Sequence, residues 1–212
     1  MSSNIIICTG GSLGAWALQH MEDSDFYIGA DSGALFLVDN GIPPHVAIGD
    51  FDSVTAEERE RIAANCGEII PCDPVDKNYT DTELAFRLAL SRKPSRIKLL
   101  GALGTRFDHA LANVHLLALA EAEGVEACIL DKHNAISLAT SSLVVHQGGY
   151  SQVSLLPLTE AVTGITLSGF QYPLQNATLT IGQSLGISNV LAEPTGTVLL
   201  TSGKLLVIQS RD

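Results

Sequence analysis

The sequence predicts an α/β domain followed by a small all-β domain. In the first 140 residues, short β-rich runs alternate with helical segments, the pattern of a mostly parallel sheet with flanking helices. After about residue 140 the helical periodicity disappears, and short runs rich in Val, Leu, Ile and Thr are separated by glycines, as in a β-sandwich. We therefore expect an α/β domain over residues 1–140 and a β-sandwich domain over residues 148–212.

Composition narrows the class of protein further. The 212 residues are 46% apolar and 17% charged, a balance typical of a folded chain with a sizeable core. The 23 acidic and 12 basic residues give a net charge of -11, which disfavours nucleic acid and anionic membranes as partners. The N-terminus has no signal-peptide pattern, and the four cysteines are scattered without metal spacing. We expect a cytoplasmic protein with reduced cysteines.

Six short apolar runs in the first part predict the strands of the sheet. Each is four or five residues long, and most are separated by helical or turn segments. The runs are residues 4–8, 26–30, 46–49, 68–71, 96–100 and 126–130.

Three segments between these runs predict helices. Residues 55–65 form a polar surface helix that ends before Gly67. Residues 80–91 begin with a Thr and a Glu spaced for a capping box, in which each side chain bonds the other's backbone amide. Residues 108–123 carry apolar side chains at helical spacing and stop at Gly124, where a left-handed residue closes a helix.

The second part predicts only strands. Four apolar runs stand out, at residues 152–156, 177–181, 197–201 and 204–209. A β domain of about 65 residues is marginal alone, so we expect docking or dimerisation to stabilise it.

Asp50 and Asp52 form the most informative pair. They directly follow the strand predicted at 46–49, and in extended backbone the side chains of residues i and i+2 point the same way. Both carboxylates can then bind one divalent cation while Phe51 packs on the other side, at the edge of a parallel sheet where ligands gather. The alternative is that Asp52 and Ser53 only cap the next helix.

A second group stands at a predicted helix start, where free amides and the dipole favour an anion. Lys77, Thr80 and Asp81 suit a nucleotide phosphate together with its Mg²⁺, although Thr80 and Asp81 are also ordinary capping residues. A glycine-bearing turn after the strand at 96–100 adds Arg106, whose planar guanidinium fits phosphate oxygens. His109, on the helix that follows, could have a structural role or act as a general base.

Taken in this order, these segments resemble the thiamine pyrophosphokinase family. The elements GDFDS at 49–53, TDTELA at 80–85 and RFDHALAN at 106–113 form a specific ordered set. The other matching stretches are 30–34, Lys77, 154–158, 169–174 and 186–189, so the resemblance spans almost the whole chain.

The resemblance implies transfer of the pyrophosphoryl group of ATP to thiamine, with Mg²⁺ as cofactor, by a homodimer with thiamine near the subunit interface. It implies a catalytic set comprising Asp50, Asp52, Asp81, Arg106 and Asp108, of which Asp50, Asp52 and Asp81 hold the metal. The nucleotide-binding residues would be Asp31, Ser32, Gly33, Lys77, Thr80 and Arg106. The thiamine-binding residues would be Tyr172, Ser188 and Asn189.

The chain departs from the family pattern at three positions. Asn78 stands where Asp is frequent, Thr105 where a second glycine often precedes the arginine, and Val190 where a Glu commonly follows Ser-Asn. Three other functions remain open. The Asp-x-Asp element also occurs in nucleotide-sugar transferases, a pyrophosphokinase could act on a pterin alcohol, and a regulator could bind nucleotide or thiamine without catalysis.

Overall fold

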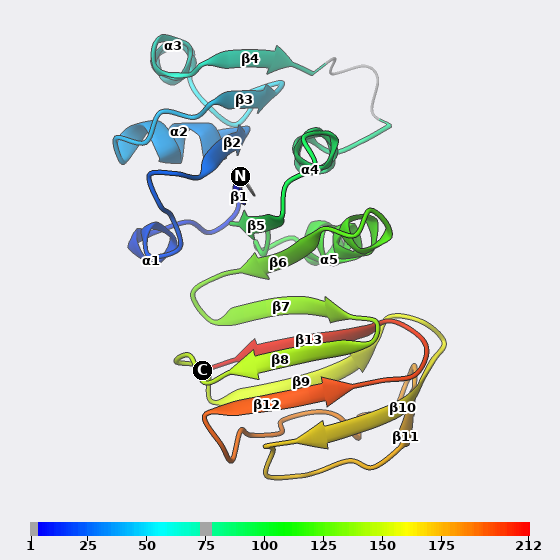
Figure 1. Cartoon of the computed structure of the whole chain (residues 1–212). Coiled ribbons are helices and arrows are strands. Elements are labelled where there is room, and N and C mark those ends of the chain that lie inside the picture. The colour runs from blue at the N-terminus through cyan, green and yellow to red at the C-terminus, as the bar shows by residue number, and fades with distance from the viewer. Residues whose placement is uncertain (1–3, 73–77) are drawn as a thin grey trace. The chain divides into compact units, whose positions relative to one another are not determined.

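The computed structural model describes residues 4–72 and 78–212 of the chain. The chain forms two compact units, Met1–Lys132 and His133–Asp212. The first is α/β and the second is all-β, which confirms the predicted fold class (Figure 1). The units divide a few residues before the predicted end of the first domain, and the limits 1–140 and 148–212 stay a prediction.

Six parallel strands form the sheet of the first unit, and all six coincide with the predicted runs. Their spatial order is β4-β3-β2-β1-β5-β6, and every neighbouring pair is parallel. They are β1 (Asn4–Cys8), β2 (Phe26–Ala30), β3 (Val46–Gly49), β4 (Glu68–Pro71), β5 (Arg96–Leu100) and β6 (Glu126–Leu130).

The strand order reverses direction at β1. From β1 to β4 each new strand adds to one side, whereas β5 and β6 add to the other side of β1. Because parallel crossovers are right-handed, the reversal places the later helices on the opposite face of the sheet. Figure 1 shows α1 (Ala15–Leu18), α2 (Ser32–Asp39) and α3 (Ala56–Asn65) on one face, and α4 (Asp81–Ser91) and α5 (Phe107–Ala122) on the other. In such sheets the reversal leaves a crevice at the carboxyl ends of the central strands.

The core of the first unit follows from strands that are covered on both faces. Ile5, Ile6 and Ile7 are consecutive, and at most 1% of each is exposed, which is typical of a strand inside a parallel sheet. A smaller cluster joins α2, β3 and α3 through Ala34, Ala47, Phe51 and Ile62. This cluster fixes the segment that carries Asp50 and Asp52.

The helix ends differ in part from the sequence prediction. Helix α4 begins as predicted, because the Thr80 hydroxyl accepts a hydrogen bond from the Glu83 amide at 3.1 Å. The Glu83 carboxylate, however, accepts from Arg87 at 2.9 Å, so the reciprocal half of the box is not seen. Helix α3 has the complete capping box, between Thr55 and Glu58. Helices α1 and α2 were not predicted.

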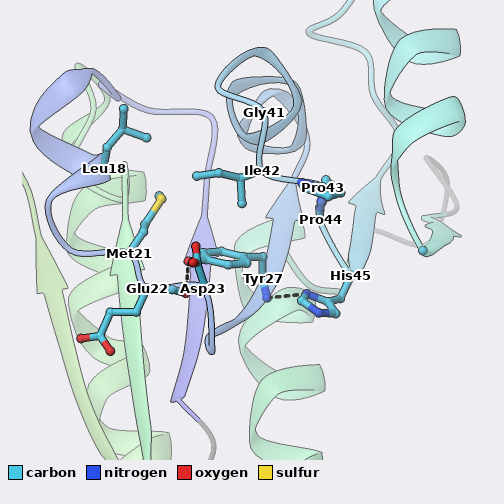
Figure 2. Close-up of a pocket in the computed structure, with 11 residues that line it drawn as sticks. Leu18, Met21, Glu22, Asp23, Tyr27, Gly41, Ile42, Pro43, Pro44 and His45 are labelled. Carbon is cyan, nitrogen blue, oxygen red and sulfur yellow. Dashed lines mark hydrogen bonds between the residues drawn. The ribbon is translucent and has the colours of Figure 1, made fainter.

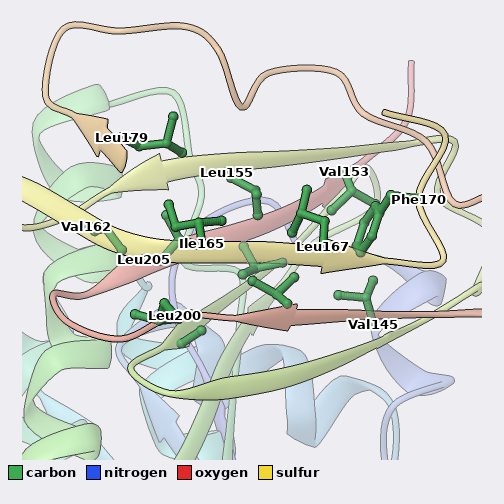
Figure 3. Packing of buried hydrophobic residues seen from close by; sticks show 13 residues of the cluster. Val145, Val153, Leu155, Val162, Ile165, Leu167, Phe170, Leu179, Leu200 and Leu205 are labelled. Carbon is green, nitrogen blue, oxygen red and sulfur yellow. The ribbon is translucent and has the colours of Figure 1, made fainter. Parts of the chain in front are cut away.

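The second unit contains two antiparallel arrangements of strands. One has the order β7-β13-β9, formed by β7 (Asn134–Ala139), β13 (Leu205–Ser210) and β9 (Gln152–Pro157). The other has the order β11-β10-β12-β8, formed by β11 (Ala177–Thr180), β10 (Ala161–Ser168), β12 (Thr195–Leu199) and β8 (Ser142–His146). Both contribute to one apolar core, with Val153, Leu155, Val162, Ile165 and Leu205 among its members (Figure 3).

Candidate functional site

A large cleft lies at the carboxyl ends of the strands in the first unit. Its volume is about 1200 Å³, and its walls come from the segments that follow β1, β2, β3, β4 and β5 and from the first turns of α4 and α5. Pockets for single drug-sized ligands usually measure about 300–1,000 Å³, so the cleft has room for a ligand as large as a nucleotide.

The floor of the cleft is a close contact between the segments after β1 and β5. The Thr9 hydroxyl donates to the Gly101 carbonyl at 2.6 Å, and both groups are buried. A Cβ atom on Gly11 would overlap the Gly101 carbonyl oxygen, so only glycine permits this approach. Gly11 therefore has a packing role at the centre of the sheet.

Three carboxylates converge in this cleft. One oxygen each from Asp31, Asp50 and Asp52 lie within 4.8 Å of one another. The Ser53 hydroxyl donates to Asp31 Oδ2 at 2.6 Å, and the Asp52 amide donates to Asp50 Oδ1 at 3.1 Å. These bonds orient two of the three carboxylates within the group.

The sequence argument assumed extended backbone between Asp50 and Asp52, but the backbone there is not extended. Phe51 has φ 58°, a left-handed conformation that bulky residues rarely adopt. Its side chain is 4% exposed and packs against the cluster with Ile62, while the Arg59 guanidinium lies 5.7 Å from the ring centroid. Burial of Phe51 thus sets the turn at this strand end. The capping alternative for Asp52 is wrong, because Thr55 is the N-cap of α3.

Burial and mutual repulsion shift the protonation of the acidic groups. The pKa of Asp31 is raised, first by burial and then by the charges of Asp52 and Asp50, although the Ser53 hydrogen bond opposes the shift. The pKa of Asp81 is raised by burial and by the charges of Asp50, Asp31 and Asp52. Like charges disfavour ionisation when they share a site, so a bound cation would stabilise the ionised form of these carboxylates.

Cys72 adds a neutral neighbour to the acidic groups. Burial, followed by a hydrogen bond and repulsion from Asp81, raises the pKa of its thiol to about 12. The thiol therefore stays protonated near neutral pH, and it supports the Asp81 carboxylate as a hydrogen-bond partner.

Arg106 lies at the opposite wall, as the N-cap residue of α5. Its guanidinium donates to both oxygens of Asp108, at 2.6 and 3.2 Å, and both side chains are largely exposed. The contact lowers the pKa of Asp108. Asp108 does not itself line the cleft, so within this structure its contact with the site runs through Arg106.

The other predicted nucleotide residues divide into two groups. Asp31, Thr80 and Arg106 line the cleft, whereas Ser32 and Gly33, at the start of α2, do not. Gly33 has a packing role, because a Cβ atom there would overlap the Cys8 carbonyl of β1. Lys77 lies outside the described residues.

The predicted thiamine residues all lie in the second unit. Asn189 is buried and binds the backbone of Tyr172 twice, accepting from its amide at 3.1 Å and donating to its carbonyl at 2.7 Å. Asn189 Oδ1 also accepts from the Val190 amide, and the Ser188 amide donates to the Ser154 hydroxyl. An Asn has two donors and two lone pairs, so one Nδ2 hydrogen is left over from these three bonds. Asn189 thus fixes Tyr172, whose side chain is 59% exposed.

A second cavity, of about 510 Å³, opens at the amino ends of β2 and β3 (Figure 2). Its walls are mainly apolar, and it contains none of the predicted site residues. His45 Nδ1 accepts from the Tyr27 amide at 3.0 Å, and the Tyr27 hydroxyl donates to the Glu22 carbonyl at 2.7 Å. Although this cavity is smaller and more apolar, the convergence of charged groups identifies the larger cleft as the site.

Sequence reasoning missed several cleft residues. Cys72 follows β4 directly, and the rule that placed Asp50 and Asp52 at a strand end would have found it. The same rule would have grouped Asp31 with them, since it follows β2. Tyr79 gave no signal beyond its place before a helix.

An acidic cleft at the reversal point of a parallel sheet defines a class of α/β proteins that bind ligands at the carboxyl ends of their strands. A sequence model described as "Thiamin pyrophosphokinase, catalytic domain" matches residues 17–129. A second, described as "Thiamin pyrophosphokinase, vitamin B1 binding domain", matches residues 141–205. The chain belongs to the thiamine pyrophosphokinase family.

Individual relatives support the assignment. The chain is 34% identical over 195 residues to a thiamine pyrophosphokinase of Bacillus subtilis (strain 168), covering 91% of each chain. A crystal structure of thiamine pyrophosphokinase from Bacillus subtilis matches with a TM-score of 0.92 at 34% identity, covering 99% of this chain and 100% of that one. The enzyme from Geobacillus thermodenitrificans matches with a TM-score of 0.87 at 33% identity, covering 99% and 98%.

No helix within residues 4–72 and 78–212 is long and apolar enough to cross a membrane.

Proposed function

We propose that this chain transfers the pyrophosphoryl group of ATP to thiamine, producing thiamine diphosphate and AMP. The observation that carries the proposal is the convergence of Asp31, Asp50 and Asp52 in a nucleotide-sized cleft, in a chain whose second part matches a vitamin B1 binding family. The hydroxyl oxygen of thiamine attacks the β-phosphorus, and the bond from that phosphorus to the α,β-bridging oxygen breaks. AMP leaves with the bridging oxygen, and the hydroxyl proton passes to solvent.

Mg²⁺ is the cofactor of the proposed reaction, and the acidic group fits it. Carboxylate oxygens are the ligands Mg²⁺ takes in proteins, and Asp31 Oδ1 is buried without a hydrogen-bond partner among the described residues. Asp31, Asp50 and Asp52 would hold the ion, with Asp81 as the further ligand predicted from the sequence. When bound, Mg²⁺ neutralises charge on phosphate oxygens and orients them.

The chain's own cations complete the phosphate site. Arg106 lines the cleft, and Asp108 takes two of the five N–H donors of its guanidinium, so the remaining donors can bind phosphate oxygens. Thr80 and the free amides at the start of α4 offer donors, although the Thr80 hydroxyl oxygen already accepts from Glu83. Lys77 stays a predicted phosphate ligand, and Ser32 and Gly33 stay predicted nucleotide contacts. Catalysis of this kind depends on positioning and charge stabilisation.

Thiamine binding is assigned to the second unit. Tyr172 offers an exposed aromatic ring for the thiamine rings, and Ser188 offers a hydroxyl for the aminopyrimidine edge. Asn189 contributes by fixing Tyr172 and by its one remaining donor hydrogen. We also propose a homodimer, since Ile181 and Leu185 in this unit are 64% and 63% exposed.

One experiment tests the reaction and its acceptor together. The protein is incubated with ATP and Mg²⁺, with and without thiamine, and AMP and thiamine diphosphate are quantified. We expect AMP only with thiamine, in a 1:1 ratio to thiamine diphosphate. AMP with a pterin alcohol but not with thiamine would change the acceptor, and sugar transfer from a nucleotide sugar would change the chemistry. Tight binding of both ligands without any AMP would indicate a regulator.

A further inference from the structure

Tyr79 lines the cleft at a position the reaction itself does not require. It lies two residues before Asp81, just ahead of α4, and 49% of the residue is exposed. An aromatic ring with one apolar face open to a cleft is a stacking surface for a planar ligand.

The ring is held from one side. The Arg87 guanidinium carbon lies 4.8 Å from the Tyr79 ring centroid, over the ring. Arg87 is in turn fixed one helical turn away, because its Nη2 and Nε atoms lie 2.8 and 2.9 Å from Glu83 Oε1. Two side chains of α4, Glu83 and Arg87, thus orient the ring.

The arrangement also shows which face is open. Tyr79 lines the cleft, whereas Arg87, whose guanidinium lies over one face of the ring, does not. Within residues 4–72 and 78–212, no other aromatic ring or cation stacks on Tyr79. The face opposite Arg87 thus carries no stacked ring or cation, and with 49% of the residue exposed it is the face that Tyr79 offers to a ligand.

We propose that Tyr79 is the platform on which the adenine base of ATP stacks. The inference rests on the proposed function, which places the phosphates beside the acidic group and Asp81. The base of that nucleotide lies a ribose and the α-phosphate away from the metal-bound phosphates. Among the described residues that line the cleft, the aromatic rings are those of Tyr79 and His109, and Tyr79 is the larger one and lies two residues before Asp81. The thiamine residues proposed above belong to the other unit, so Tyr79 is assigned to the nucleotide.

A base platform makes a specific kinetic prediction. The base does not react, so its contact contributes equally to the ground state and the transition state, and its loss raises KM without lowering kcat. Base stacking on an aromatic residue contributes enough that its removal weakens binding about tenfold. We expect Tyr79→Ala to raise the KM for ATP about tenfold at an unchanged kcat, and Tyr79→Phe to behave like the wild type.

Direct binding measurements distinguish a contact with the base from a contact with the phosphates. Calorimetric titrations compare AMP with inorganic tripolyphosphate, for the wild type and both variants. We expect Tyr79→Ala to lose about tenfold in affinity for AMP and to bind tripolyphosphate unchanged. Arg87→Gln, which removes the cation behind the ring and leaves the ring in place, should give a smaller loss for AMP.

Several outcomes would contradict the platform. One is that Tyr79→Ala binds AMP as tightly as the wild type, or that it loses affinity equally for AMP and for tripolyphosphate. The others are that Tyr79→Ala raises only the KM for thiamine, or that the wild type does not bind AMP. A thermal unfolding scan of each variant checks that it is folded, and Tyr79→Leu replaces the alanine variant if that one is not. Failure of the proposed reaction would appear separately, as wild-type protein that binds AMP but forms no thiamine diphosphate.

Discussion

The charge of Asp31 destabilises the folded protein, but it also suits Asp31 as a ligand of the proposed metal ion. Its carboxylate is partly buried beside Asp50 and Asp52, and one of its oxygens has no hydrogen-bond partner among the described residues. Burying a charge without a partner destabilises the folded state, and functional sites are where proteins retain such groups. The acidic group is thus suited to a cation and unfavourable without one.

The first prediction concerns the two aspartates found from the sequence. Replacing Asp50 or Asp52 with Asn removes one negative charge from the proposed metal site and keeps the shape of the side chain. We expect turnover to fall by a factor of about 10² or more, since charge stabilisation is a main term in phosphoryl transfer. Steady-state assays at saturating ATP, Mg²⁺ and thiamine would measure it, with circular dichroism to show intact folding. Near-normal turnover in both variants would contradict the metal assignment.

The second prediction follows from the raised pKa of Asp31. A carboxyl group whose pKa is higher in the folded state than in the unfolded state destabilises the fold once it ionises. In metal-free protein at pH 7, Asp31→Asn should therefore raise the unfolding midpoint, by no more than about 2–4 °C because water screens a partly exposed carboxyl. The gain should shrink as the pH falls through the raised pKa toward the ordinary value near 4, because the wild-type carboxyl then also becomes neutral.

Thermal scans with a chelator, at several pH values, would test this sign. Asp23→Asn is the matched control, because Asp23 is exposed and lies far from the acidic group, beside the second cavity. It should change the midpoint little at any pH. A midpoint for Asp31→Asn below that of the wild type at pH 7 would contradict the argument.

The pairing of Asp50 and Asp52 also shows what sequence could predict at this scale. Their types and their place after a strand were enough to predict a shared site. The turn at Phe51 was not predictable from alternation, because it depends on burial of the ring against Ile62, a residue on another element. Likewise, the proximity of Asp31 depends on the pairing of β2 with β3.

At the scale of elements, regular periodicity decided which segments could be predicted. The six strands of the first unit are short runs rich in β-branched and other apolar residues, and all were found. Helix α2 was missed because SGALFLVD is apolar on most sides and shows no clear polar face. Strand β10 was missed because a bulge between Val162 and Ile165, with Gly164 at φ 72°, interrupts its alternation.

The third prediction concerns α3, the helix behind the acidic turn. Thr55→Ala removes the side chain that accepts from the Glu58 amide at 3.2 Å and leaves that amide unpaired. Loss of an N-cap destabilises a protein by about 1 kcal/mol. We expect that loss in urea unfolding and normal turnover, since Thr55 does not line the cleft. Ser91→Ala, at the exposed end of α4, serves as a control outside any N-cap, and a smaller loss for Thr55→Ala than for this control would contradict the role of the cap.

At the scale of the whole molecule, two units with separate cores contribute different chemistry. The first provides the charged groups of the cleft, and the second provides a separate apolar core and several exposed apolar side chains. The sequence predicted this division because helices and strands differ in the period of their apolar residues, and the helical period disappears after about residue 140. The proposed dimer depends on association between chains, which a single sequence does not encode locally.

The fourth prediction is that the protein is a dimer in solution. Sedimentation equilibrium should give about twice the monomer mass of 22.4 kDa at micromolar concentration. Leu185→Glu places a charge among the exposed apolar side chains and should shift the equilibrium toward monomer, whereas Glu193→Gln, on the same unit, should not. A monomer in the wild type would contradict the dimer.

The contact between Thr9 and Gly101 has a consequence for biosynthesis. These residues are 92 positions apart in the chain, yet their bond lies at the centre of the sheet. Ribosomes add about 5–20 residues per second, so β1 waits roughly 5–20 s before β5 is made and can pair with it. During that interval one edge of β1 has no neighbour, and the nascent chain is most exposed to misassociation before residue 101 leaves the ribosome.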